Sequence, residues 1–155
     1  MTPTAPYEPK YTDAFDMRYG LFIHWVGCSP TQGAGITAPD GTPYLPGSIN
    51  DYAEDIDVEA VADEMERLGF EYVLITDFHG FGTMLHPSEV SDRWRGKGYA
   101  SDRDVIGEMI AALKERGIGF VLFTHPVAGH TYTDKEELGW NDPTDGYKKY
   151  NDFIN

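Results

Sequence analysis

Three histidines stand where apolar segments of the chain end. His24 closes "GLFIH", His79 closes "EYVLITDFH" and His125 follows "IGFVLFT". An imidazole can bind a metal ion, transfer a proton or hydrogen-bond a polar ligand. One histidine at such a position is more often a packing residue, whereas three at one rim of a sheet indicate a functional pocket. We therefore expect at least two of the three to line the same site.

Two further residues belong to this expected site. Trp25 follows His24, and its indole offers a flat apolar surface for the C–H face of a sugar whose hydroxyls bind imidazoles. The alternative for Trp25 is a core aromatic that covers the end of the sheet. Asp77 lies two positions before His79, so the two side chains share a face if the strand continues. Asp77 can equally cap the strand end by accepting hydrogen bonds from loop amides.

A metal site is another reading of these residues. Such a site needs three or four ligands at about 2.1 Å, often with a carboxylate among them. The first apolar segment carries no His-x-His pair, and no helix carries an HExxH motif. We therefore expect neither a metal nor a cofactor, and we assign His86 and His130 to surface or loop packing.

The elements that must position these residues follow from the apolar pattern. Runs without polar alternation predict strands at 20–25, 71–78 and 119–124, covered on both faces as in a parallel sheet. Three- and four-residue spacing predicts helices at 57–68 and 102–116. Their expected apolar stripes are Val58, Val61, Met65 and Leu68, and then Val105, Ile106, Met109, Ile110 and Leu113.

Capping residues support both helices, and a third helix follows "NDPTDG". Asp57 is the expected N-cap of the first helix, and Ser101 or Asp102 that of the second. Gly69 and Gly117 are expected to end them. In the third helix the apolar face should hold Tyr147, Tyr150 and Ile154.

The order β-α-β-α-β-α predicts an α/β fold with a parallel sheet and right-handed crossovers. The turns from helix to strand are short, whereas the segments 26–54 and 80–101 that follow strands are long. This asymmetry is typical of a (β/α)8 barrel, whose site lies at the carboxyl ends of its strands. A whole barrel needs about 200 residues or more. We therefore expect residues 1–17 to form an irregular lead-in, and residues 18–155 to be an N-terminal, incomplete portion of a barrel with about three βα units.

The charge of the chain limits its partners. The 155 residues contain 26 acidic and 12 basic side chains, so the formal net charge is −14. Such a surface repels phosphate backbones and anionic lipids, so neither nucleic acid nor a membrane is an expected partner. The first 13 residues have neither a basic start nor an apolar core, so we expect no signal peptide and, by default, a cytoplasmic location. The single cysteine, Cys28, leaves no internal disulfide.

Three motifs in order resemble the α-L-fucosidase family, glycoside hydrolase family 29. "RYGLFIHWVG" is similar to that family's first strand, of the "FGLFIHWG" type. "EYVLITDFHGFGTMLHPSEVSDRW" resembles its "YVVLTAKHHDGF…PS…SDW" unit, and "SDRDVIGEMIAALKERGIGFVLFTHP" resembles its third unit. The resemblance implies a retaining glycosidase, a carbohydrate partner such as a fucoside, and a sugar-binding role for His24 and His79.

The sequence also departs from the family's pattern. Gly80 stands where the family has the second histidine of a pair, and His125 falls near an aromatic position of strand 3. In the family the aspartate nucleophile follows strand 4, so we expect these 155 residues to carry sugar-binding residues but no catalytic carboxylate. Two alternatives stay open: a non-catalytic carbohydrate-binding relative, and a metal-dependent barrel hydrolase. Exposed sheet edges also predict self-association.

Overall fold

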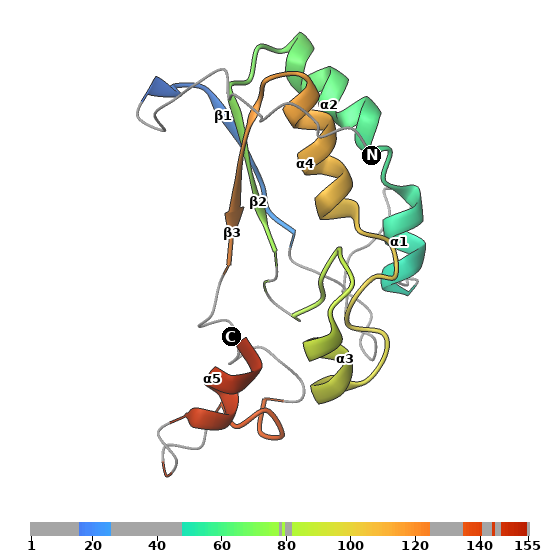
Figure 1. Cartoon of the computed structure of the whole chain (residues 1–155), viewed down its shortest axis with the longest axis vertical. Coiled ribbons are helices and arrows are strands. Elements are labelled where there is room, and N and C mark those ends of the chain that lie inside the picture. Colours follow the sequence, from blue (N-terminus) through green and yellow to red (C-terminus); the bar gives the residue numbers. More distant parts are fainter. Residues whose placement is uncertain are drawn as a thin grey trace, which may run out of the picture.

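Five helices and one sheet make up the part of the chain that the computed structural model describes, which is residues 16–25, 48–77, 79, 82–124, 135–140, 144 and 147–154. Three parallel strands alternate with helices, as the sequence predicted (Figure 1). In chain order the elements are β1 (Gly20–Ile23), α1 (Ile49–Asp55), α2 (Val58–Arg67), β2 (Tyr72–Thr76), α3 (Glu89–Arg95), α4 (Val105–Glu115), β3 (Gly119–Phe123) and α5 (Lys148–Ile154).

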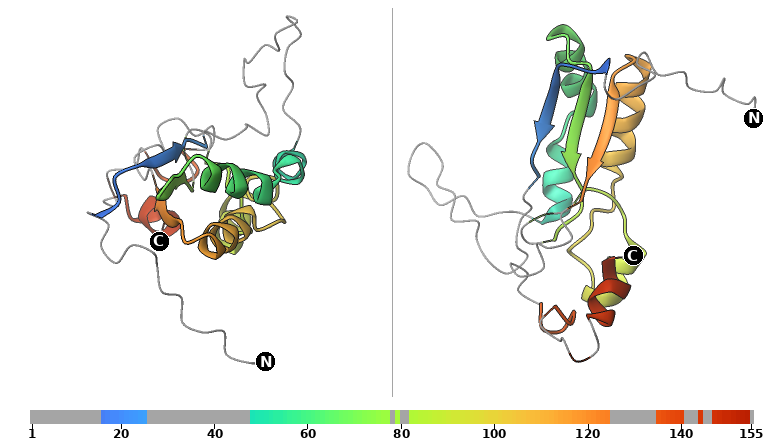
Figure 2. Two further views of the ribbon diagram at one scale, coloured as in Figure 1. Left: turned by 90° about the horizontal axis from the view of Figure 1, so that it is seen from above. Right: turned by 90° about the vertical axis from the view of Figure 1, so that its left-hand side faces the viewer.

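The sheet has the order β1-β2-β3, with β2 in the middle and both pairs parallel. The right-hand view of Figure 2 shows the three strands side by side in front of the helices. The register places Phe22 beside Leu74, and Leu74 beside Val121. Because the strands run in one direction, their carboxyl ends meet at one edge of the sheet. The residues that follow β1 and β2 are therefore neighbours in space.

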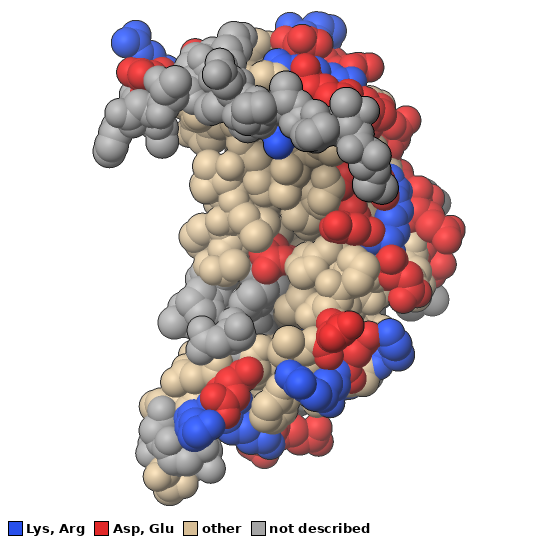
Figure 3. Space-filling view, in the orientation of Figure 1, with Lys and Arg blue, Asp and Glu red and all other residues tan. Residues whose placement is uncertain are grey.

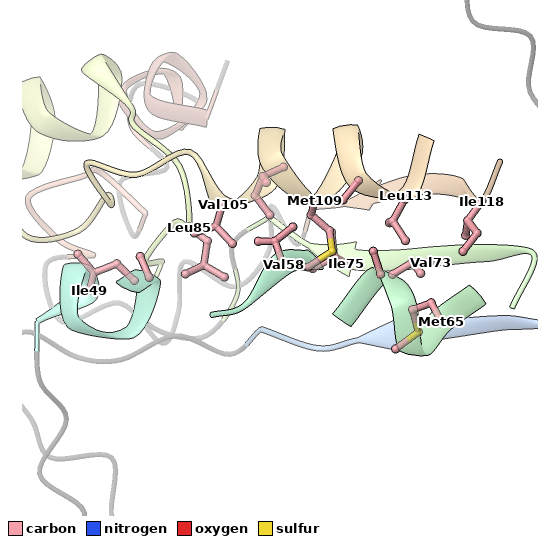
Figure 4. Close-up of a cluster of buried hydrophobic side chains, with 14 residues drawn as sticks. Ile49, Val58, Met65, Val73, Ile75, Leu85, Val105, Met109, Leu113 and Ile118 are labelled. Atoms are coloured by element: carbon pink, nitrogen blue, oxygen red, sulfur yellow. The ribbon is translucent and has the colours of Figure 1, made fainter. Parts of the chain in front are cut away.

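Helices α1, α2 and α4 cover one face of the sheet and enclose the main core (Figures 1 and 4). Val73 and Ile75 of β2 point into this core, where Leu113 of α4 is completely buried. Alternation along the strand explains this arrangement, since residues 73 and 75 share one face and residues 72, 74 and 76 share the other. Burial of apolar side chains on this one face is what holds the helices to the sheet.

The helix boundaries agree with the predicted caps, with one correction. The Asp57 side chain accepts a hydrogen bond from the amide of Ala60, and Gly69 ends the turn after α2 with φ of 75°. Gly117 has φ of 67° after α4. The N-cap of α4 is Asp104, which accepts a hydrogen bond from the amide of Gly107. The expectation of Ser101 or Asp102 was wrong, because the helix begins later along the chain than its pattern suggested.

Three residues of the predicted apolar stripes are exposed instead of buried. Leu68 is 45% exposed and Ile110 is 38% exposed, since each lies at the rim of its helix face rather than over the sheet. In α5 the buried side chains are Tyr150 and Phe153, whereas Tyr147 precedes the helix and is exposed. The side chain of Ile154 lies outside the described residues.

Two arginines tie the helices together. Arg116, after α4, forms ion pairs with Glu59 and Asp63 of α2. Arg103, before α4, donates hydrogen bonds to the carbonyl oxygens of Ala53 and Ile56 at the end of α1. Carbonyl groups at a helix end lack intrahelical partners, so the guanidinium of Arg103 satisfies them.

Among the described residues no helix covers the second face of the sheet, whereas the strands were expected to be covered on both sides. Phe22 is 49% exposed, Val121 42% and Phe123 36%. Lys, Arg, Asp and Glu gather over the helices in Figure 3, while much of the surface in the middle of that view is uncharged. No described helix is both long enough and apolar enough to cross a membrane.

The two helices that the sequence did not predict are short. Ser48 caps α1 through a capping box with Asp51, and Ile49 and Ala53 are buried against the main core. Ser88 caps α3, which lies against α5. A second cluster lies around α3 and α5, beyond the carboxyl ends of the strands, and is made of Met84, Ala100, Leu138, Tyr150 and Phe153, with Val90, Trp94 and Trp140 at its margin.

Candidate functional site

His24 and His79 contact each other at the carboxyl-end edge of the sheet. His24 follows β1 and His79 follows β2, and their ring centroids are 4.5 Å apart with the planes at 87°. The imidazole of His24 also stacks on Phe22, at 5.1 Å and 15°. Phe22 belongs to the open face, so the paired imidazoles lie at the end of that face. Two of the three strand-end histidines are thus brought together.

Aromatic rings continue this surface toward β3. Phe22 and Phe123 meet edge to face with centroids 5.8 Å apart. Both are partly exposed, so they offer an apolar surface next to the imidazole nitrogens. Sequence reasoning missed Phe22 as a site residue, although it lies two positions before His24 and therefore shares its face. A ligand that combines C–H surface with hydroxyl groups matches this combination.

Trp25 lies on the helix side of the sheet. Its ring packs against the main core and meets Tyr52 edge to face at 6.0 Å. The indole N–H donates a hydrogen bond of 3.1 Å to the carbonyl oxygen of Thr83. The hydroxyl of Thr76, which is fully buried, donates to the carbonyl oxygen of Trp25 at 2.8 Å. This position matches the alternative of a core aromatic that covers the end of the sheet, and a role as a sugar platform stays a prediction.

Asp77 pairs with His86. The Nε2 atom of His86 is 2.6 Å from Oδ1 of Asp77, and Nδ1 is 2.9 Å from the carbonyl oxygen of Pro87. The alternation that would have put Asp77 and His79 on one face stops at Thr76, where β2 ends. The hydrogen bond to Asp77 raises the pKa of His86, and burial opposes that rise only in part.

His86 lies in an irregular segment and packs there against Asp77, which agrees with the expected loop packing. Its side chain is 28% exposed and that of Asp77 is 13% exposed, so the pair is largely removed from solvent. No sequence signal joins these two residues across an irregular segment; only the fold brings them together. The amide of Asp77 donates to the carbonyl oxygen of Phe123, which fixes the end of β2 against β3.

Two of the predicted residues cannot be placed in this site. His125 and His130 lie outside the described residues. Within the described residues, no group of three or more His, Cys, Asp or Glu side chains is arranged to hold a metal ion. The site as described thus consists of two imidazoles in contact, an apolar aromatic surface beside them, and a carboxylate–imidazole pair behind the end of β2.

Solved structures of fucosidases share this fold. The chain superposes on an α-L-fucosidase from Bacteroides thetaiotaomicron with a TM-score of 0.59 and 21% identity, over 95% of this chain and 37% of that one. It also matches an α-L-fucosidase from Paenibacillus thiaminolyticus, with a TM-score of 0.54, 21% identity and coverage of 88% and 36%. The parallel sheet with its helices is thus confirmed as part of a (β/α)8-type architecture.

Sequence comparison agrees with the fold. The chain is 30% identical to tissue α-L-fucosidase from Rattus norvegicus over 74% of its length, and 30% identical to the human protein over 70%. It spans 29% and 28% of the lengths of these two relatives. The family model "Alpha-L-fucosidase" matches residues 50–154. The chain therefore belongs to the α-L-fucosidase family of glycoside hydrolases.

Proposed function

We propose that the carboxyl-end edge of this sheet recognises the sugar of an α-L-fucoside or a related glycoside, as part of a retaining glycoside hydrolase. The contact between His24 and His79, with ring centroids 4.5 Å apart at the ends of adjacent strands, carries the proposal. Two imidazoles at this separation can reach neighbouring hydroxyls of one pyranose ring. Each ring nitrogen can donate or accept a hydrogen bond, as a hydroxyl requires.

The surroundings of the two imidazoles support a sugar as the ligand. A deoxy sugar has an apolar C–H surface in addition to its hydroxyls, and aromatic side chains pack well against such a surface. Phe22 stacks on His24 and also meets Phe123, so an apolar surface begins next to the imidazoles. The curated relatives are named tissue α-L-fucosidase, which agrees with a fucoside as the ligand.

Catalysis requires more than this sugar-binding edge. A retaining glycosidase uses two carboxyl groups about 5–5.5 Å apart, one as nucleophile and one as acid and base. By resemblance the nucleophile follows a fourth strand, while the described residues form three. Asp77, the carboxylate nearest the strand end, already pairs with His86. We propose that the 155 residues bind the sugar without cleaving it.

The expected result for the 155-residue chain is binding without turnover. Adding L-fucose should shift the ring-proton NMR signals of His24 and His79, whereas its enantiomer D-fucose at the same concentration should not, because a chiral site distinguishes the two. No 4-nitrophenol should be released from 4-nitrophenyl α-L-fucoside.

Two outcomes would contradict this proposal. Absence of any shift with L-fucose would remove the sugar-binding role. Turnover that persists through purification and is lost in Asp77→Asn would show that Asp77 acts as a catalytic carboxylate.

The open face and the β3 edge should make the isolated chain associate with itself. Val121, Leu122 and Phe123 are all exposed on an edge strand whose outer backbone groups can pair with another chain. Sedimentation should show species heavier than 17.4 kDa, and replacing Val121 and Leu122 by lysine should shift the population toward the monomer. A cooperative, monomeric melt of the unaltered chain at all concentrations would contradict this expectation.

A further inference from the structure

The His86 ring lies between two oxygen atoms that can only accept hydrogen bonds. Nδ1 is 2.9 Å from the carbonyl oxygen of Pro87, and Nε2 is 2.6 Å from Oδ1 of Asp77. A neutral imidazole has one N–H donor, so it can satisfy only one of these oxygens. Both contacts are hydrogen bonds only when both nitrogens carry protons. The geometry is therefore that of an imidazolium bound to a carboxylate.

The groups around His86 favour this protonated form. The carboxylate of Asp77 faces it from the end of β2, and the carboxylate of Asp104 lies at the start of α4. Both raise the pKa of His86, the hydrogen bond to Asp77 most, while burial acts in the opposite direction. The side chains of the pair are 28% and 13% exposed, so solvent screens them only in part.

The hydrogen bond between His86 and Asp77 links the segment that follows β2 to the end of that strand. The indole N–H of Trp25, which follows β1, donates a hydrogen bond to the carbonyl oxygen of Thr83 in this segment. The carbonyl oxygen of Leu85 accepts a hydrogen bond from the amide of Ile106 in α4. His86 adds a direct link back to Asp77. His79 lies inside the loop that this link closes.

The link from His86 to Asp77 joins residues on either side of His79 in the sequence. Asp77 is two residues before His79 and is itself fixed to β3 through its amide. The link from Asp77 to His86 joins the two ends of the loop directly, in addition to the bonds made at Thr83 and Leu85. The edge-to-face contact with His24 depends on where that loop places the His79 ring.

We propose that His86 is a positioning residue whose protonated ring binds Asp77, closes the loop that carries His79, and thereby sets the contact between His79 and His24. Loss of one proton from His86 leaves a ring lone pair facing one of the two oxygen atoms, so one contact is lost and the bond to Asp77 is no longer charge-assisted. This role of His86 rests on the proposed function only in naming this edge a sugar site.

The direction of the pH dependence follows from the raised pKa of His86. The pKa of this histidine is higher in the folded state than in the unfolded state, where it is about 6.5. Its protonation therefore stabilises the fold in full when the pH is below the unfolded-state pKa. That contribution disappears as the pH rises through the folded-state pKa. The link from His86 to Asp77 should therefore be strongest in mild acid and weaker in mild alkali.

An NMR titration of the unaltered 155-residue chain tests this directly. The ring protons of His86 should titrate above about 6.5. The signals of His24 and His79 should show, besides any inflection of their own, one at the His86 midpoint. Titration of His86 at or below the ordinary value, or no inflection of the His79 signal at its midpoint, would overturn the proposal.

Two variants separate positioning from simple stability. In His86→Gln the side-chain amide can still donate to Asp77 but cannot titrate, so the shared inflection should vanish while the circular dichroism spectrum stays unchanged. Asp77→Asn removes the charge and keeps the backbone bond to Phe123, so the midpoint of His86 should fall. A shared inflection that persists in His86→Gln would contradict the role of His86.

A binding arm adds a functional readout. The affinity for L-fucose should decrease as the pH passes through the His86 midpoint, and His86→Gln should lose that step. If L-fucose does not bind at any pH, the proposed function fails while the ring-proton titration still decides the role of His86.

Discussion

Replacing Leu113 by alanine is expected to lower the free energy of unfolding by about 2–5 kcal/mol, the range for deleting a fully buried leucine. Leu113 lies on the inner face of α4 and has no exposed surface. It belongs to the main core, with Val73 of β2 and Ile118 among its members (Figure 4). Alanine would leave a cavity that this densely packed layer cannot close. Urea unfolding followed by circular dichroism measures the change.

Ile110→Ala in the same helix is the matched control. Ile110 is 38% exposed, so the substitution removes about the same number of atoms while creating much less cavity. We expect a loss well below that of Leu113→Ala, near the range for surface substitutions of about 0.5 kcal/mol. Equal losses for the two variants would show that α4 does not pack on the sheet through the face described.

The alternation of strands and helices could be predicted because its signals are local. Continuous apolar runs correspond to β1, β2 and β3, and the spacing of Val58 and Met65 corresponds to the buried face of α2. Asp57 and Gly69 mark the ends of that helix by chemistry that acts within a few residues. A parallel sheet then follows, since each helix connects one strand to the next.

Burial was predicted less well because it depends on what covers each face. The run of Leu21, Phe22 and Ile23 indicated a strand buried on both sides, and the strand formed. Its open face, however, is uncovered at Phe22. A pattern of apolar residues shows which side chains favour burial. It does not show which surface packs against them. For the same reason Leu68 and Ile110 lie exposed at the margins of stripes that are otherwise buried.

The short helices α1 and α3 were missed because seven residues give too few turns for a periodic signal. Ser48 with Asp51 at the third position was nevertheless a readable capping box. Tertiary contacts then stabilise the helix, through Ile49 and Ala53 in the core. Capping signals inside long segments between elements are thus informative where periodicity is not.

The candidate site could also be predicted only in part from the sequence. His24 and His79 could be brought together from topology, because parallel strands end at one edge. The pairing of Asp77 with His86 depends on the path of an irregular segment, and no spacing rule predicts such a path. Residue type alone could not choose between the two roles considered for Trp25. Its contacts with the Tyr52 ring and the Thr83 carbonyl match the core aromatic, and the sugar platform stays a prediction.

His24→Ala and His79→Ala should each weaken the binding of L-fucose by roughly ten- to a hundred-fold. Each variant removes one imidazole and leaves a sugar hydroxyl without its partner, which costs about 1–3 kcal/mol of binding free energy. His24→Ala also removes the ring stacked on Phe22, so we expect it to have the larger effect of the two. Ligand-observed NMR titration measures both affinities.

Tyr19→Ala is the control at the opposite end of β1. Tyr19 is an exposed aromatic that stacks on Phe70, so its loss should leave the affinity for L-fucose unchanged. A chelator separates the two roles that imidazoles can have at this edge. If histidine hydrogen bonds hold the sugar, EDTA should not alter the affinity. If EDTA abolished binding and zinc restored it, a metal held by the strand-end histidines would replace direct hydrogen bonding. If His24→Ala bound L-fucose as well as the unaltered chain, the sugar-binding role assigned to the first strand end would be wrong.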